Sequence, residues 1–183
     1  MPIVRRTALT PTLHGAISLR PPSIQWFTTS LLQTTTSLER RPPMNILCNS
    51  IAHSGIHKCA EGAFLPKHGQ GSHAWVFSTS SSNTLWEGCG PTIGHKSLMT
   101  SYHAELSGLV SVLFTLHWLA HHQPQLTGTV TVYCENESAL NKVFTKQRPS
   151  NNPYTNLAAD RDLICLGRHL RSLLPDTLTI HHS

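Results

Sequence analysis

Charged side chains are scarce in this sequence, because Asp, Glu, Lys and Arg together supply only 13% of its 183 residues. Only nine of these are acids, so each carboxylate matters individually. No apolar run reaches the ~20 residues that a membrane-spanning helix needs, so no membrane partner is expected. The hydrophobic content of 39% is that of a globular protein, and the length suits one domain with a tail.

Metal-binding and disulfide patterns are also lacking. The five cysteines have no CxxC spacing and are odd in number; they are Cys48, Cys59, Cys89, Cys134 and Cys165. Neither a disulfide framework nor a zinc site is therefore predicted. The thirteen histidines show no HExxH or zinc-finger spacing, so they predict no metal site. Reduced thiols indicate an intracellular protein of the cytoplasm or nucleus.

Acids are absent from the N-terminal segment before Glu39, while arginine, proline, serine and threonine are frequent there. Most of the formal net charge of +5 belongs to this segment, so the charge gives little support for a nucleic-acid-binding face on the remainder. We expect residues 1–45 to form little regular structure. They are interpreted as a connector or as an organellar targeting segment. Residues 46–183 are then the folded domain.

Hydrophobic periodicity predicts a strand, strand, strand, helix, strand, helix, helix, strand order. The expected elements are a strand within residues 46–60 that ends near Glu61, strands 73–78 and 84–89, a helix from 101 to between 121 and 124, a strand 129–134, helices 136–146 and 154–174, and a strand 177–181. A turn at 79–83 and a loop at 148–153 separate neighbouring elements. Sequential strands form an antiparallel meander, and a strand that returns after a helix runs parallel to an earlier one. The predicted fold is an α/β domain with a mixed sheet.

Three acids occupy comparable places in this order. Glu61 lies where the first strand is expected to end, Glu105 in the opening turn of the central helix, and Glu135 at the end of strand 129–134. Strand ends and helix starts converge on one rim of such a sheet, so the three carboxylates can meet there. Carboxylates gathered in this way are neutralised by hard divalent cations. The alternative for Glu105 alone is an acid favoured by the helix dipole.

The residues around these acids resemble ribonuclease H domains. Glu61-Gly62-Ala63, followed by the sequence GQGSHAWV at residues 69–76, is similar to the first two strands of that family. Residues 102–109 (YHAELSGL) are similar to its acid-bearing helix, and residues 132–140 (VYCENESAL) to the strand and helix that hold its third acid. Residues 156–164 look most like the versions attached to retroelement reverse transcriptases. The resemblance covers about residues 58–183.

This resemblance implies a ribonuclease H-like nuclease that hydrolyses the RNA strand of an RNA–DNA hybrid. It implies Glu61, Glu105 and Glu135 as catalytic residues and as ligands of two Mg²⁺ ions, with Mn²⁺ as a substitute. Gly62, Tyr102 and Asn136 would contact nucleic acid, although packing for Tyr102 and helix capping for Asn136 are open alternatives. The implied partners are the RNA–DNA hybrid and the remainder of a reverse transcriptase polyprotein.

The sequence departs from the family in two respects. The family normally carries Asp at the positions of Glu61 and Glu135, and misplacing a catalytic group by about 1 Å can cost a hundredfold in rate. The family also carries a Gly-His loop and a fourth carboxylate on a helix after the final strand, so the domain is expected to be truncated before that helix. Asp160 and Asp162 are expected to form surface or cap interactions. A non-catalytic nucleic-acid-binding module, a decayed retroelement remnant, and an unrelated α/β protein with structural acids remain alternatives.

Overall fold

The computed structural model describes residues 43–79, 84–92, 94, 97, 99–145 and 160–183. The helices and strands among them are α2 (Met44–Ser54), β1 (Ile56–Leu65), the 3-10 helix η1 (Pro66–His68), β2 (Gln70–Thr79), β3 (Thr84–Pro91), α3 (Ser101–His122), β4 (Gly128–Cys134), α4 (Glu137–Phe144), α5 (Arg161–Ser172) and β5 (Leu178–His182). Most of the predicted N-terminal segment, most of the turn at 79–83, the loop at 148–153 and the start of helix 154–174 lie outside the described residues.

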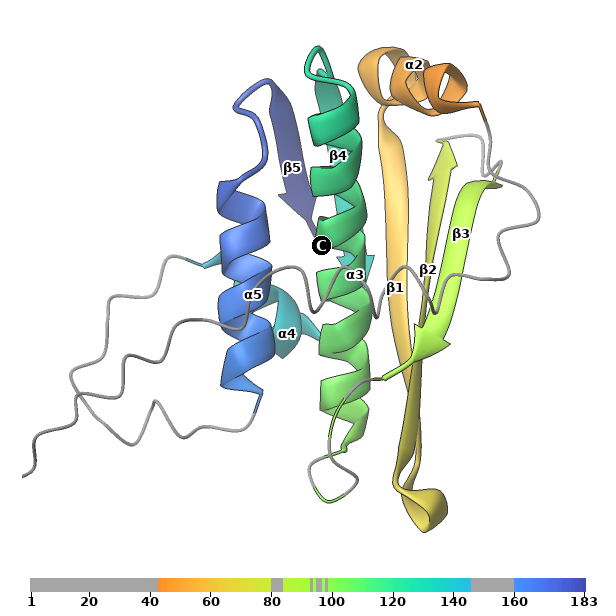
Figure 1. Ribbon diagram of the computed structural model, residues 1–183, viewed down its shortest axis with the longest axis vertical. Coiled ribbons are helices and arrows are strands. Elements are labelled where there is room, and N and C mark those ends of the chain that lie inside the picture. Colours follow the sequence, from red (N-terminus) through yellow and green to blue (C-terminus); the bar gives the residue numbers. More distant parts are fainter. Residues whose placement is uncertain (1–42, 80–83, 93, 95–96, 98, 146–159) are drawn as a thin grey trace, which may run out of the picture.

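The strands form one five-stranded sheet in the order β3-β2-β1-β4-β5. β1, β2 and β3 make an antiparallel meander, while β4 runs parallel to β1 and β5 runs parallel to β4. The chain crosses from β3 to β4 through α3, which lies beside α5 in front of the sheet (Figure 1). This arrangement confirms the predicted α/β fold class, a mixed sheet with an antiparallel meander, parallel strands and helices.

α3 is the central helix, and its start and burial follow from its sequence. The side chain of Thr100 accepts a hydrogen bond from the backbone N–H of His103 at 3.0 Å, which caps the first turn. Leucines on the predicted stripe, such as Leu106, Leu109 and Leu113, are fully buried. The predicted helix is therefore confirmed. Among the described residues, no helix is both long enough and apolar enough to cross a membrane.

β4 has the predicted alternation. Val130 and Val132 are fully buried, whereas Tyr133 on the opposite face is 39% exposed. Asn136 then caps α4, because its side-chain Oδ1 accepts from the backbone N–H of Ala139 at 3.1 Å. Glu135 therefore lies at the C-terminal end of β4, between the strand and the capped start of α4.

The strand predicted within residues 46–60 exists only from Ile56 onward. Residues 44–54 form the helix α2 instead of strand, because Leu47 and Ile51, four residues apart, are both buried against the core. Gly55, with a φ of 67°, ends the helix and redirects the chain into β1. β1 also continues past Glu61 to Leu65, since residues 62–65 pair with β2 across a hairpin that turns at Gly69.

Candidate active site

Glu61 lies in β1, and Glu135 directly follows the neighbouring parallel strand β4. The last registered pair between β1 and β4 joins Ala60 to Cys134, so Glu61 and Glu135 are the next residues along the chain from this pair. Ala60 and Cys134 are buried, and both glutamates are exposed. The structure thus brings two of the three predicted site residues side by side.

Glu105, on α3, lies next to Cys134, the residue before Glu135. It is only 7% exposed, and its Oε2 accepts a hydrogen bond from the Sγ of Cys134 at 3.7 Å. The backbone N–H of Gly62 also donates to its carboxylate. No acid lies in the first turn of α3, so the alternative role as an acid favoured by the helix dipole loses its basis.

The charges of all three glutamates interact. Burial is the largest cause that raises the pKa of Glu105, and the charges of Glu135 and Glu61 raise it further. The bonds from Gly62 and Cys134 act in the opposite direction, because they favour the ionised carboxylate. The three carboxylates predicted from the sequence therefore form one electrostatic group.

Gly62 has a structural role that the sequence did not reveal. A Cβ atom at this position would lie 2.2 Å from the backbone N of Glu105 and 2.4 Å from the backbone C of Ala104. Only glycine allows the backbones of β1 and α3 to approach so closely. This approach holds Glu105 over the strand that carries Glu61.

Tyr102 and Asn136 have local partners that match the two alternatives stated for them. Tyr102 is half-buried against the core, and the Nζ of Lys142 lies 4.7 Å from the centroid of its ring. Its hydroxyl is buried and has no hydrogen-bond partner among the described residues. Asn136 caps α4, so its side-chain oxygen is already engaged. Contact of either residue with nucleic acid stays a prediction.

The donor chemistry of this group suits a hard divalent cation, since all three side chains offer carboxylate oxygens. In the part of the chain that the structure describes, however, no three His, Cys, Asp or Glu side chains converge closely enough to hold a metal ion. Glu61 and Glu135 are exposed, whereas Glu105 is buried. A metal ion shared by all three would require their carboxylates to come closer together than they lie here.

A buried pair beside the site was missed by sequence reasoning. The Nδ1 of His103, in the first turn of α3, contacts the Oδ1 of Asp160, which directly precedes α5. The two side chains are only 8% and 9% exposed, so the predicted surface or cap role of Asp160 was wrong. Asp162 is exposed in the first turn of α5, as predicted. No local spacing signals the pair, because 57 residues separate its members.

No family model matches the chain, and no curated protein matches it. Similar solved structures include RNase H1 from the halophilic archaeon Halobacterium salinarum NRC-1, with 19% identity, 70% of this chain and 85% of that chain covered, and a TM-score of 0.49. LC11-RNase H1 in complex with an RNA/DNA hybrid is 17% identical, with 70% of this chain and 84% of that chain covered and a TM-score of 0.48. The foamy viral protease-reverse transcriptase in complex with an RNA/DNA hybrid is 10% identical, with 79% of this chain and 19% of that chain covered and a TM-score of 0.44.

Proposed function

We propose that this chain is a ribonuclease H-like nuclease that hydrolyses the RNA strand of an RNA–DNA hybrid with divalent metal ions. The observation that supports it best is the raised pKa of buried Glu105, to which the charges of Glu135 and Glu61 contribute. Like charges held together repel one another, and bound cations relieve this repulsion. Two Mg²⁺ or Mn²⁺ ions there would activate a water molecule and stabilise the leaving oxygen of a phosphodiester.

The three glutamates would have different roles in holding these ions. Glu105 is the fixed member, because the N–H of Gly62 and the thiol of Cys134 orient its carboxylate. Glu61 and Glu135 are exposed and would rotate toward it when a cation neutralises the repulsion. Tyr102 and Asn136 flank the acids in sequence and would contact the sugar and phosphate of the RNA strand.

The test is cleavage of a hybrid with labelled RNA in Mg²⁺ and in Mn²⁺. Glu105→Gln removes one charge while keeping the side-chain shape, and is expected to lower cleavage at least about a hundredfold. Glu87→Gln on β3 is the matched control, because Glu87 is exposed and belongs to the edge strand. It is expected to leave the rate unchanged. If the folded wild-type chain cleaves the hybrid with neither metal ion, the proposed nuclease activity is refuted.

Nucleic-acid binding without cleavage is the second candidate function. It is favoured by the state of Glu105, whose carboxylate already has two protein donors. For such a module, hybrid binding would be unaffected by removal of divalent metal with EDTA, and Glu105→Gln would bind as tightly as the wild type. Metal-dependent cleavage excludes this candidate.

A further inference from the structure

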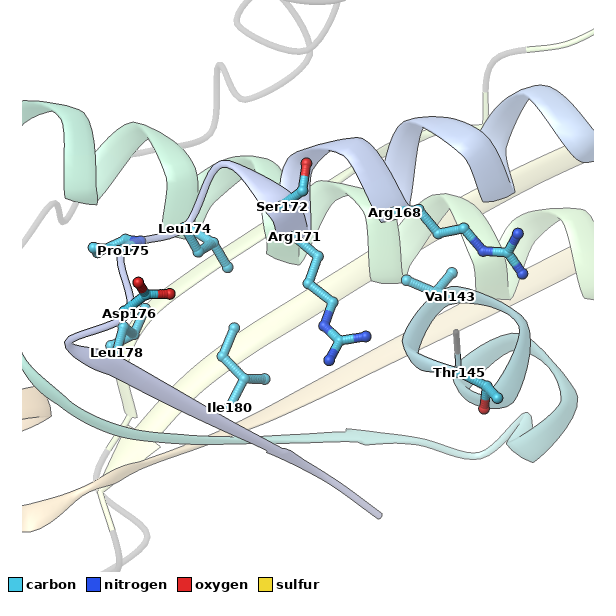
Figure 2. A pocket seen from close by; sticks show the side chains of 10 residues that line it. All are labelled: Val143, Thr145, Arg168, Arg171, Ser172, Leu174, Pro175, Asp176, Leu178 and Ile180. Atoms are coloured by element: carbon cyan, nitrogen blue, oxygen red, sulfur yellow. The ribbon is translucent and has the colours of Figure 1, made fainter. Parts of the chain in front are cut away.

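A pocket of about 790 Å³ lies apart from the three glutamates, between the C-terminal end of α4, α5 and β5 (Figure 2). Its volume falls within the range of sites that hold small molecules or groups. Apolar side chains such as Val143 and Ile180 line part of it, and Arg168, Arg171 and Thr145 supply polar groups. Figure 2 shows the single acid, Asp176, beside Pro175 and Leu178, away from the two guanidinium groups.

The two arginines are held in place by the end of α4. The Nε of Arg168 donates to the backbone oxygen of Lys142 at 2.8 Å, and the Nη1 of Arg171 donates to that of Phe144. Arg171 also lies over the ring of Phe144, 5.2 Å from its centroid. Both carbonyls belong to the last turn of α4, where the helix dipole favours cations. Each guanidinium is thus oriented by one bond and keeps four further N–H donors.

One of these donors is left without a partner. The Nη2 of Arg168 is buried and has no hydrogen bond to any residue that the structure describes. A buried donor without a partner is unfavourable, and a ligand that accepts its hydrogen bond would remove this cost. The planar fork of an arginine suits the oxygens of a phosphate, which accept two N–H groups at once. The hydroxyl of Thr145, exposed on the same side of the pocket, is a further donor.

α4 connects this pocket directly to the candidate active site. It starts just after Glu135 and Asn136, and its eight residues span about 12 Å at 1.5 Å per residue. A nucleic-acid strand rises about 3.4 Å per nucleotide, so this span corresponds to roughly three to four nucleotides. We propose that the pocket binds a backbone phosphate of the strand held at Glu61, Glu105 and Glu135. The proposal rests on the proposed function for the identity of that strand.

The first experiment measures the pocket without nucleic acid, by titration of inorganic phosphate with calorimetry and thermal shift as readouts. Wild-type chain is expected to bind phosphate and to be stabilised by it. Arg168→Gln is expected to weaken this binding about tenfold or more. Because that change also removes a cap from α4, Ser172→Glu provides a second variant, which adds a carboxylate beside the pocket and leaves both arginines bonded.

Thr179→Glu is the matched control for Ser172→Glu. Thr179 is exposed on β5 between two residues that line the pocket, so its side chain lies on the opposite face of the strand. It is expected to leave phosphate binding unchanged. Equal phosphate affinity in the wild type, Arg168→Gln and Ser172→Glu, or no binding to any of them, would show that the pocket is not a phosphate-binding site.

The second experiment tests the source of the phosphate. Hybrid binding is measured by fluorescence anisotropy against salt concentration in the Glu105→Gln background, where cleavage does not interfere. Ser172→Glu and Arg168→Gln are expected to reduce the slope of log K against log salt by about one, and Thr179→Glu is not. Unchanged slopes with intact phosphate binding would mean that the pocket takes free phosphate, and would overturn its role in strand binding. If phosphate binds in an Arg168-dependent manner while the wild type neither binds nor cleaves the hybrid, the proposed function fails instead.

Discussion

The thiol of Cys134 donates a hydrogen bond to the carboxylate of Glu105, with 3.7 Å between Sγ and Oε2. Cys134 is the last residue of β4 and directly precedes Glu135, so this bond couples the positions of two of the three acids. It also lowers the pKa of Glu105, against the raising effects of burial and of the neighbouring charges. A residue that carries no charge thereby tunes the electrostatics of the site.

Cys134→Ala is expected to move the acidic limb of the cleavage profile to higher pH. Without the thiol donor the pKa of Glu105 rises further, so a higher pH is needed to ionise its carboxylate. Cys134→Ser restores a hydroxyl donor and is expected to return the limb toward that of the wild type. The measurement is the rate of hybrid cleavage across pH. Identical profiles for the Ala variant and the wild type would show that the thiol does not tune Glu105.

Shorter carboxylates at positions 61 and 135 are expected to raise cleavage. In the resembled family Asp occupies the positions of Glu61 and Glu135, and an error of about 1 Å in a catalytic position can cost a hundredfold. The double variant Glu61→Asp/Glu135→Asp should therefore raise kcat/KM by up to about a hundredfold. Glu137→Asp is the control, because Glu137 is exposed in the first turn of α4. A slower double variant would show that the site is built for the longer side chains.

The sequence predicted those features of the fold that depend on local periodicity. α3 was recognised because its leucines recur on one face, and β4 because Val130 and Val132 alternate with Thr131 and Tyr133. That Glu61 and Glu135 are neighbours could also be predicted without coordinates, since a parallel pairing of their strands brings the two positions side by side.

The features that were missed depend on contacts between distant residues. α2 has only eleven residues, and its buried pair Leu47 and Ile51 resembles the scattered apolar residues of a strand. The requirement for Gly62 comes from the backbone of α3, more than forty residues later in the chain. The contact of His103 with Asp160 likewise arises only when α3 and α5 pack together.

Stability is expected to fall as the pH drops from about 6.5 toward 4, because of His73. This side chain is 6% exposed, its Nε2 is hydrogen-bonded with the Oγ of Ser111 at 3.1 Å, and burial lowers its pKa to about 4. Between the two pKa values the unfolded chain binds a proton that the folded chain does not, so the free energy of unfolding decreases by up to about 3 kcal/mol.

Urea unfolding at a series of pH values measures this effect. His73→Gln does not titrate, so its stability should vary less than that of the wild type over the same interval. His68→Gln is the control, because His68 is exposed in η1. If His73→Gln and the wild type lose stability in parallel, another group is responsible for the pH dependence.

Lys58→Met is expected to stabilise the protein by about 1–4 kcal/mol, the range for replacing buried ionic groups with apolar ones. Lys58 is fully buried in β1, and burial lowers the pKa of its amine well below the ordinary value. Its Nζ donates only one described hydrogen bond, to the backbone oxygen of Val112 at 3.4 Å, and lies 2.9 Å from the centroid of the Phe77 ring. Methionine fills similar space and requires no desolvation of a charge.

The advantage of Lys58→Met is also expected to depend on pH. Below the ordinary lysine pKa of about 10.4 the unfolded wild type keeps a proton that the folded state binds less well. Raising the pH toward that value removes this cost, so the wild type gains stability and the difference from Lys58→Met shrinks. Lys67→Met, at an exposed position in η1, should change stability by less than about 0.5 kcal/mol. Urea unfolding at pH 7 and pH 10 provides the comparison, and a variant that is less stable than the wild type at both would show that the buried amine contributes more than it costs.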